Sequence, residues 1–207
     1  GEVVWDGDKI RAVKNFVSLN IRIPHQVFDC SKMGYQYIFD RERNAFNNTL
    51  IISPPGAGKT TFLRDITRLL SHQRPIINVL LVDERSEIAA VHNSTPQLDV
   101  GQNTDIISNS SKAFAFEQGI RAMRPDVIVV DELAGGEDIE AINYALSAGV
   151  AVIASIHAKN IYDLCNKKNF DIIVTKKLFD LFMVLSNLHG PGTVQGIFDS
   201  DFKEIAI

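Results

Sequence analysis

From residue 49 onward, the chain alternates short, continuously apolar runs with longer segments in which apolar residues recur every three to four positions. The apolar runs predict strands, at Thr49–Ser53, Asn78–Val82, Val127–Asp131, Val150–Ser155 and Asp171–Thr175. The recurring pattern predicts helices, at Lys59–Ser71, Ser111–Met123, Ile139–Ala148 and Ile161–Lys167. Strands without polar alternation are buried on both faces, so we predict an α/β fold with a mainly parallel sheet flanked by helices.

The C-terminal part of the chain carries three further apolar runs, at Phe182–Ser186, Gly192–Asp199 and Glu204–Ile207. We predict that these runs are antiparallel strands that extend the sheet at its edge.

The N-terminal part has a different pattern. Alternating residues around the turn at Asp6-Gly7 predict a hairpin, made of Glu2–Trp5 and Lys9–Phe16. A short strand at Ser18–Ile23 and one helix within residues 29–48 are expected to follow. We therefore divide the chain into two parts: residues 1–47, the remnant of an N-terminal domain with its linker, and residues 48–207, the main domain.

Composition narrows the class of protein. The 207 residues carry a net charge of −4, which argues against a broad nucleic-acid-binding surface, because such surfaces are basic. Cys30 and Cys165 lack metal-binding spacing and are expected to be reduced thiols of a cytosolic protein. No apolar run approaches the roughly 18 residues of a membrane span. The chain opens in mid-strand without a methionine, so we expect an upstream part to have been left out.

The stretch SPPGAGKTT lies between a predicted strand and a predicted helix, where phosphate-binding loops are found. Gly56 and Gly58 leave room for backbone N–H groups to converge on phosphate oxygens, and the helix N-terminus adds its positive dipole end. Lys59 is placed to reach the β and γ phosphates, the Thr60 hydroxyl to bind Mg²⁺, and Thr61 to contact the α phosphate. The expected nucleotide-binding set is Ser53, Pro54, Pro55, Gly56, Ala57, Gly58, Lys59, Thr60 and Thr61.

One position departs from the usual G-x-x-x-x-G-K-[ST] pattern. Ser53 stands where that pattern has glycine. A small residue is compatible with the loop if its φ is negative.

Two predicted strands end in acids. Asp131 is a candidate for the Mg²⁺ shell and Glu132 for the base that polarises the attacking water. Asp83 and Glu84 end another strand and offer the same pair of roles, as a metal ligand and a catalytic acid. Carboxylates at the C-terminal ends of parallel strands lie at the edge where such sheets bind ligands. The alternative for both pairs is solvated loop acids.

His157 ends a third strand and is a candidate to hydrogen-bond the γ phosphate, although a single histidine there is more often structural. Four arginines are candidates to neutralise charge on the phosphates, namely Arg22, Arg85, Arg121 and Arg124. Arg121 and Arg124 precede the Asp131 strand and are expected to act within their own subunit. Each arginine is otherwise a surface or helix-end charge.

Taken in order, SPPGAGKTT, VDERSEIA, VIVVDELA and VIASIHA resemble the boxes of the type II/type IV secretion ATPase superfamily, which is RecA-like. The phrases SLNIRI, TLIISPPGAGKTTFLRDI, QLDVGQNTDI, RAMRPDVIVVDE and LSNLHGPGT resemble its sporulation branch, the stage III sporulation protein AA family. The resemblance spans nearly the whole chain and implies that Glu84 and His157 are functional. Asn103 departs from it, since the family usually has arginine there, and LAGGED matches only in part.

The resemblance also implies partners. The family consists of cytoplasmic ATPases that form ring oligomers, hexamers in expectation, and act on membrane-embedded sporulation secretion or channel proteins in the mother cell. It implies that an arginine reaches each ATP from the neighbouring subunit, and Arg22 is the first candidate.

We therefore expect a Mg²⁺-dependent ATPase motor subunit that binds ATP. Two alternatives from other classes stay open: a nucleic-acid-binding P-loop NTPase, and a nucleotide-binding assembly scaffold with little turnover. Stimulation of ATPase activity by single-stranded nucleic acid would indicate the first alternative, and a negligible turnover rate the second.

Overall fold

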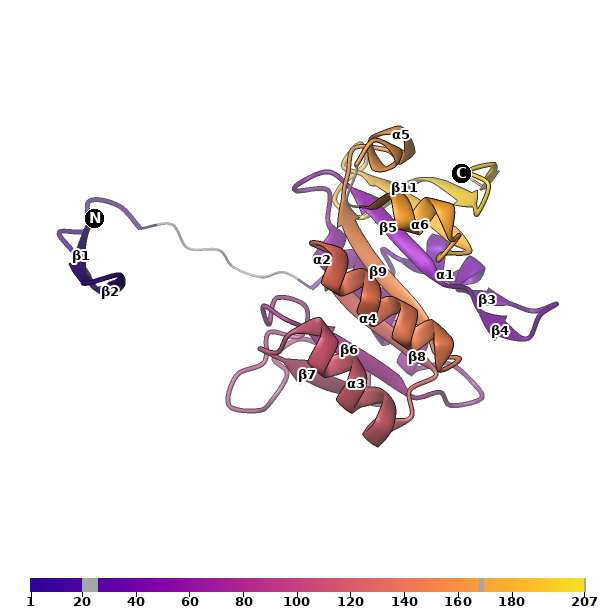
Figure 1. The fold of residues 1–207 in the computed structure, drawn as a ribbon, viewed down its shortest axis with the longest axis horizontal. Coiled ribbons are helices and arrows are strands. Elements are labelled where there is room, and N and C mark those ends of the chain that lie inside the picture. Colours follow the sequence, from indigo (N-terminus) through magenta and orange to yellow (C-terminus); the bar gives the residue numbers. More distant parts are fainter. Residues whose placement is uncertain (20–25, 168–169, 207) are drawn as a thin grey trace.

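The computed structural model describes residues 1–19, 26–167 and 170–206 (Figure 1). Its centre is an eight-stranded sheet in the order β12-β11-β10-β5-β9-β8-β6-β7. These strands are β5 Thr49–Ser53, β6 Val79–Asp83, β7 Thr104–Ser108, β8 Val127–Glu132, β9 Ala151–His157, β10 Leu181–Ser186, β11 Thr193–Asp199 and β12 Glu204–Ala206. The six strands from β10 to β7 run parallel, and β11 and β12 continue antiparallel. The predicted α/β fold, with a mainly parallel sheet and antiparallel strands at one edge, is confirmed.

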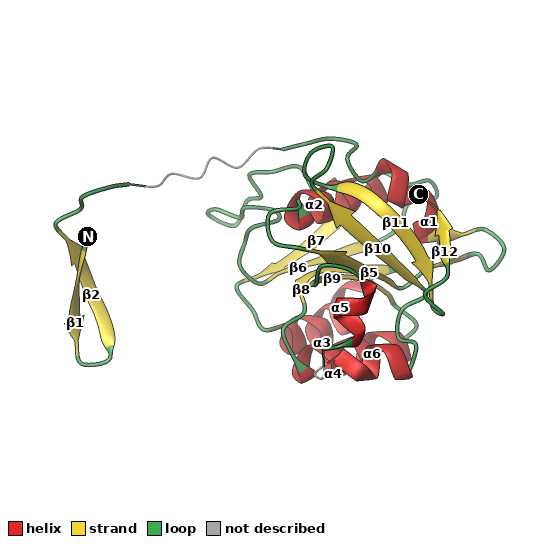
Figure 2. Cartoon of the chain, turned by 90° about the horizontal axis from the view of Figure 1, so that it is seen from above, coloured by secondary structure: helices red, strands yellow, loops and turns green. Residues whose placement is uncertain are grey.

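Helices cover both faces of the sheet (Figure 2). They are α1 Lys32–Ile38, α2 Lys59–Ser71, α3 Lys112–Met123, α4 Gly136–Ser147, α5 Ile161–Cys165 and α6 Asp171–Thr175. Phe62 and Ile66 of α2 and Ile38 of α1 pack on one face, in a core of their own. Phe116 of α3 and Ile142 of α4 pack on the other face, together with α5 and α6. Each face of the strands is therefore apolar, which explains the continuous Ile/Val runs.

Two predicted strands need correction, and one strand was not predicted. The segment Asp171–Thr175 is helix α6, in which only Ile173 is buried, whereas a central strand would be buried on both faces. A short apolar run does not distinguish these two states. Thr104–Ser108 is an unpredicted edge strand, only half-buried and with polar residues at both ends. The run at 182–186 belongs to β10, which lies inside the sheet, parallel to β5 and antiparallel to β11.

The N-terminal hairpin is confirmed. Strands β1 Glu2–Asp6 and β2 Lys9–Lys14 pair with each other in a separate sheet, drawn apart from the main sheet in Figure 1. The expected strand at Ser18–Ile23 falls largely outside the described residues. Helix α1 is the helix expected before residue 48, and a two-stranded sheet of β3 Phe39–Asp40 and β4 Ala45–Phe46 follows it. The division at residue 47 stays a prediction.

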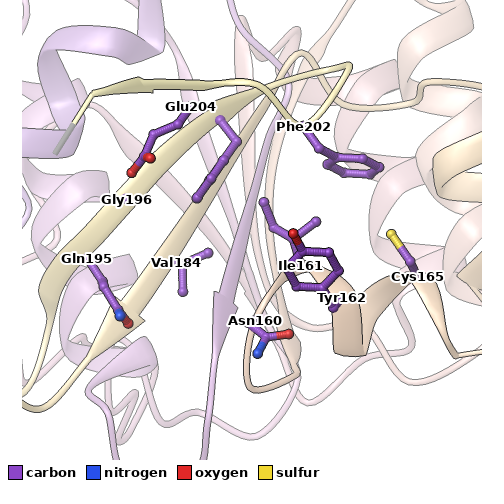
Figure 3. A pocket seen from close by; sticks show the side chains of 10 residues that line it. Asn160, Ile161, Tyr162, Cys165, Val184, Gln195, Gly196, Phe202 and Glu204 are labelled. Atoms are coloured by element: carbon purple, nitrogen blue, oxygen red, sulfur yellow. The ribbon is translucent and has the colours of Figure 1, made fainter.

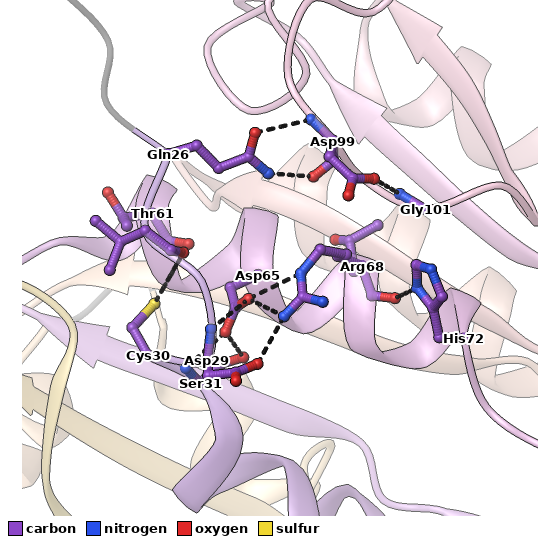
Figure 4. Close-up of polar contacts among 12 residues, drawn as sticks. Gln26, Asp29, Cys30, Ser31, Thr61, Asp65, Arg68, His72, Asp99 and Gly101 are labelled. Atoms are coloured by element: carbon purple, nitrogen blue, oxygen red, sulfur yellow. Dashed lines mark hydrogen bonds and ion pairs between the residues drawn. The ribbon is translucent and has the colours of Figure 1, made fainter.

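Polar contacts fasten the segment before α1 to helix α2 (Figure 4). The buried carboxylate of Asp65 accepts hydrogen bonds from the backbone and hydroxyl of Ser31, at 2.9 and 2.7 Å, and pairs with Arg68. Burial alone would raise the pKa of Asp65, but these hydrogen bonds outweigh it and lower the pKa. Burial and the Asp65 charge raise the pKa of the Cys30 thiol to about 12, so Cys30 stays protonated. Both cysteines are free thiols, as expected.

Within the described residues, none of the helices combines the length and the apolar character needed to cross a membrane.

Candidate phosphate-binding site

Because side chains alternate between the two faces of a strand, several polar side chains lie on one face of the sheet. Side chains two positions apart on a strand share a face. Residues Ile51, Leu81, Val129 and Ile153 all face α2. Two positions further on, at the C-terminal strand ends, stand Ser53, Asp83, Asp131 and Ser155. His157 follows Ser155 by two more positions. The polar ends of these four strands therefore meet beside the N-terminus of α2.

A β-bulge brings Glu132 to the same face as Asp131. On the paired strands, Val129 lies opposite Ile153 and Glu132 lies opposite Ser155, so three steps on β8 match two on β9. The extra residue rotates the strand end and re-aims the side chain that follows. Two consecutive carboxylates can therefore line one cavity, which a regular strand does not allow.

Asp131, Glu132, Ser155 and His157 line an open cavity of about 600 Å³, whereas Ser53 and Asp83 are not part of its lining. The phosphate loop contributes Pro54, Pro55, Gly56, Gly58, Lys59, Thr60 and Thr61. The facing wall contains Glu84, Arg85, Glu87, Lys112, Asp131, Glu132, Ser155, His157 and Pro191. The structure therefore brings the predicted loop together with Glu84, Asp131, Glu132 and His157.

A second hollow, of about 400 Å³, lies between α5 and strands β10 to β12 (Figure 3). Its lining is mainly apolar and includes Ile161, Val184, Phe198 and Phe202. Its described lining has no lysine or arginine side chain, and the N-terminus of the short helix α5 beside it is already capped by the Asn160 side chain, which accepts from the Asp163 N–H. It is therefore a poor site for a phosphate chain, and the cavity beside α2 is the better candidate.

The loop has the backbone geometry of a phosphate cradle. Gly56 and Gly58 have φ angles of +76° and +91°. No side chain caps the N-terminus of α2, so its first N–H groups are available to an anion. Ser53 is fully buried, and its φ is not among the positive values, so the condition for replacing glycine is met. Its hydroxyl contacts the Pro54 carbonyl oxygen at 3.0 Å.

Lys59, Glu132 and His157 form a three-way contact. Lys59 Nζ lies 3.2 Å from Glu132 Oε2 and 2.9 Å from His157 Nδ1, and His157 Nε2 lies 3.3 Å from the same glutamate oxygen. Burial lowers the pKa of Lys59, although the charge of Glu132 opposes this shift. The loop cation therefore lies beside both the predicted base and the predicted histidine.

The sequence analysis did not identify Lys112, whose side chain contacts three carboxylates at the cavity. Its side chain is only 5% exposed, and its Nζ lies 2.5 Å from Glu84 Oε2, 3.5 Å from Asp131 Oδ1 and 3.8 Å from Asp138 Oδ2. Burial lowers the pKa of Lys112, but the Glu84 hydrogen bond and the charges of Asp131 and Asp138 outweigh it and raise the pKa. One signal was available. A lysine in the first turn of α3 opposes the helix dipole, which indicates acidic partners.

Asp131 suits a divalent cation. Its Oδ1 is buried and accepts no hydrogen bond, and Thr60 lines the same cavity. Burial raises the pKa of Asp131 to about 6, although the Lys112 charge lowers it. Among the described residues, no three His, Cys, Asp or Glu side chains form a metal cage. Mg²⁺ at phosphate sites needs only one or two carboxylates, with phosphate and water oxygens, so a hydroxyl and Asp131 fit it.

The structure argues against Asp83 as a metal ligand. Asp83 is fully buried, and its two oxygens accept backbone hydrogen bonds from Glu87, Ile88 and Ala89, at 2.9 to 3.2 Å. Arg64 holds the same loop by donating to the Glu87 and Ile88 carbonyls. Because its oxygens are already bound, we reassign Asp83 to bracing the loop that carries Glu84.

The four candidate arginines differ in where they lie relative to the cavity. Arg121 is exposed and pairs with Glu117 at 2.8 Å. It lies nine residues along α3 from the cavity-lining Lys112, which is about 14 Å along the helix axis at 1.5 Å per residue. This position argues against the expected action of Arg121, and of Arg124 beyond it, in the cavity of their own subunit. Arg85 lines the cavity. Arg22 lies outside the described residues and stays a sequence-based candidate.

Asn103 has a local structural role. Its backbone N–H donates to Ser71 Oγ at 2.7 Å, and its side-chain amide donates to the Ser71 carbonyl at 2.9 Å. These bonds satisfy the C-terminal end of α2, which lies opposite the phosphate loop. The departure from arginine therefore falls at the far end of the helix from the cavity.

Comparison with known proteins identifies the family of this chain. The family model described as sporulation stage III, protein AA, matches residues 1–205. Stage III sporulation protein AA of Bacillus subtilis (strain 168) is 38% identical over 206 residues, which are 97% of this chain and 66% of that protein. The chain thus spans about two thirds of the length of this relative.

Two solved structures share the fold. The VirB11 ATPase of the Brucella suis type IV secretion system, in complex with sulphate, has a TM-score of 0.51 at 18% identity, over 73% of this chain and 49% of that chain. The pilus retraction motor PilT with bound ADP has a TM-score of 0.50 at 16% identity, over 81% and 49%.

Proposed function

The chain belongs to the sporulation stage III protein AA family, and from this premise we propose that it is a Mg²⁺-dependent ATPase. We propose further that it is a motor subunit that energises a membrane-embedded secretion or channel apparatus during endospore formation. It would act in the cytoplasm of the mother cell and would be attached to the membrane through its partners. We propose that it forms a homo-oligomeric ring, and we expect this ring to be a hexamer. The VirB11 ATPase structure contains sulphate and the PilT structure contains ADP, which supports an anion and nucleotide site on this fold.

One observation carries the ATPase proposal. Lys59 begins α2, and it lies opposite Glu132 in the same cavity as Thr60 and Asp131. The loop would hold the phosphates through its N–H groups and Lys59, and Thr60 with Asp131 would hold Mg²⁺. Mg²⁺, when bound, neutralises charge on the phosphate oxygens.

Glu132 is a better candidate than Glu84 for the base. Each carboxylate contacts a lysine, but the two lysines differ. Lys59 belongs to the loop and would turn to the phosphates of a bound nucleotide, which releases Glu132. Lys112 is buried among three carboxylates and would stay paired with Glu84. A free carboxylate accepts a proton from water more readily than one in a close ion pair.

The nucleic-acid alternative has little support. The net charge is −4, and four of the residues lining the phosphate cavity are acidic: Glu84, Glu87, Asp131 and Glu132. A fifth acid, Asp138, lies 3.8 Å from the lining residue Lys112. Such a surface repels a polyanion outside the loop itself. The turnover rate distinguishes the scaffold alternative from an ATPase, because a scaffold would bind ATP and hydrolyse little of it.

The test uses the purified chain with and without Mg²⁺ and ATP. Calorimetry measures nucleotide affinity, phosphate release measures turnover, and native mass spectrometry measures the oligomer. Saturable ATP binding with Mg²⁺-dependent turnover is expected. Absence of both would refute the proposal, binding with negligible turnover would indicate a scaffold, and stimulation by single-stranded DNA or RNA would indicate the nucleic-acid class.

A further inference from the structure

The hydroxyl of Ser155 is buried and has no hydrogen-bond partner. Ser155 is 1% exposed, on the central strand β9. Within the described part of the chain, four side chains carry a buried polar atom without a hydrogen-bond partner: Ser86, Asp131, Ser155 and Ser186. Of these, Asp131 and Ser155 line the phosphate cavity. A buried hydroxyl without a partner is unfavourable and rare, so its retention beside a cavity points to a ligand.

The position of Ser155 indicates which ligand its hydroxyl would bind. Strand β9 lies between β5, which leads into the phosphate loop, and β8, which carries the acids. Ser155 lies opposite Ile51 on one side and opposite Glu132 on the other. Neighbouring strands are about 4.8 Å apart, so one water hydrogen-bonded to both side chains fits between hydroxyl and carboxylate. The ammonium of Lys59, which would hold the terminal phosphate, contacts that same carboxylate.

We propose that Ser155 and Glu132 together hold the water that attacks the terminal phosphate of ATP. The water oxygen would bond to the γ phosphorus as the bond from that phosphorus to the β–γ bridging oxygen breaks and ADP leaves. Glu132 would take the proton of this water, and the Ser155 hydroxyl would fix the direction of the water lone pair toward phosphorus. This inference rests on the proposed ATPase function and adds a residue to its site. It also explains why β9 carries one serine among buried apolar residues.

The experiment replaces Ser155 by alanine. Ser155→Ala removes a hydroxyl that has no protein partner, so the variant should fold and melt like the wild type. Turnover should fall about 10- to 100-fold, because the water loses one of its two positioning contacts. The Michaelis constant and the affinity for a non-hydrolysable ATP analogue should stay within about twofold, because phosphate contacts are unchanged.

Two matched variants separate water positioning from packing. Ser186→Ala deletes another buried, unpartnered serine hydroxyl, on β10 and outside the cavity lining, and should turn over normally. Ser155→Thr keeps the hydroxyl and should recover most of the activity. Ser155→Cys keeps the volume without a strong hydrogen bond and should lose activity like alanine, which provides a second variant if Ser155→Ala does not fold.

The possible outcomes distinguish the proposed ATPase function from the proposed role of Ser155. A wild-type chain that binds no ATP or does not hydrolyse it contradicts the ATPase proposal itself. Wild-type turnover with an equally fast Ser155→Ala overturns only the serine inference. Weakened analogue binding with unchanged hydrolysis of bound ATP would mean that the hydroxyl contacts phosphate, and it overturns the inference too. Equal losses in Ser155→Ala and Ser186→Ala would indicate general packing.

Discussion

The backbone N–H of Gly192 donates a hydrogen bond of 2.7 Å to the carbonyl of Ala57. This bond fastens the turn between β10 and β11 directly onto the phosphate loop. A Cβ atom on Gly58 would lie 2.4 Å from the Gly192 nitrogen and 2.7 Å from the Pro191 carbonyl carbon. Gly58 therefore allows the close approach of these two backbones, in addition to its place in the phosphate loop.

Replacement of Gly58 by alanine should damage the loop more than the same change at Gly56. Both residues have positive φ, so each alanine meets a strain of about 1 to 2 kcal/mol. A Cβ on Gly56 meets nothing within 4 Å, whereas at Gly58 it meets backbone. Thermal unfolding should show Gly58→Ala to be the less stable variant, and calorimetry should show that it binds ATP more weakly. Equal behaviour of the two variants would contradict the proposed contact.

Lys59→Ala should abolish tight ATP binding, because it removes the cation that faces the β and γ phosphates. The side chain lies at the cavity rather than in either apolar core, so the fold should persist. Calorimetry measures the affinity, and far-ultraviolet circular dichroism checks the fold. Lys176→Ala, an exposed lysine after α6, is the matched control. Unchanged affinity in Lys59→Ala would exclude this loop as the nucleotide site.

Glu132→Gln should keep ATP bound and slow its hydrolysis by about 100-fold or more, because an amide does not accept the proton from water. Glu84→Gln should have a smaller effect, because Glu84 is held by Lys112. Single-turnover measurements with prebound ATP compare the two variants. If Glu84→Gln is the slower one and Glu132→Gln turns over normally, the two roles are exchanged.

The sequence predicted the strands and helices that have a long, unambiguous pattern, and it failed where the pattern is short. The five residues DIIVT form a short helix in which Ile173 is buried and Ile172 is partly buried against the core, and so short an apolar run does not distinguish a helix from a strand. Strand β7 escaped prediction because an edge strand is half-buried and need not be apolar throughout. The parallel direction of β10 depends on its neighbour β5, which no local pattern encodes.

The site was predictable where chemistry follows from a motif and unpredictable where it follows from three-dimensional contacts. Lys59, Asp131 and Glu132 follow from the loop and the acidic strand end. The saturation of Asp83 by backbone N–H groups depends on how the next six residues turn. Lys112 belongs to a helix read as amphipathic, and its burial among carboxylates requires α3, α4 and β8 to be in place.

Lys112→Met should destabilise the protein, because it leaves Asp131 and Asp138 without their counter-charge. Both carboxylates are mostly buried, at 19% and 15% exposure, while Glu84 is 44% exposed and contributes less. A loss on the order of 2 kcal/mol is expected, below the 3 to 5 kcal/mol of fully buried pairs. Urea unfolding measures it at pH 7.

A double-mutant cycle isolates the contact between Lys112 and Glu84. The cost of Lys112→Met should be smaller in a Glu84→Gln background, because one of the three carboxylates is then neutral. Lys32→Met, an exposed lysine at the start of α1, should change stability by less than about 0.5 kcal/mol. Additive effects of Lys112→Met and Glu84→Gln would show that the 2.5 Å contact is energetically unimportant.

Asp131 makes the stability of the protein depend on pH. Burial raises its pKa to about 6, from 3.8 in an unfolded chain, so the folded state binds more protons between these values. Stability therefore falls as pH rises from about 4 to about 6, and the penalty is complete above the folded pKa. Two pKa units correspond to about 3 kcal/mol. Asp131→Asn removes this penalty and should be more stable than the wild type at pH 7.5, in chelator without Mg²⁺. The advantage should shrink toward zero at pH 4, where both side chains are neutral. Urea unfolding at several pH values measures the difference, and a difference that does not change with pH would contradict a raised pKa at Asp131.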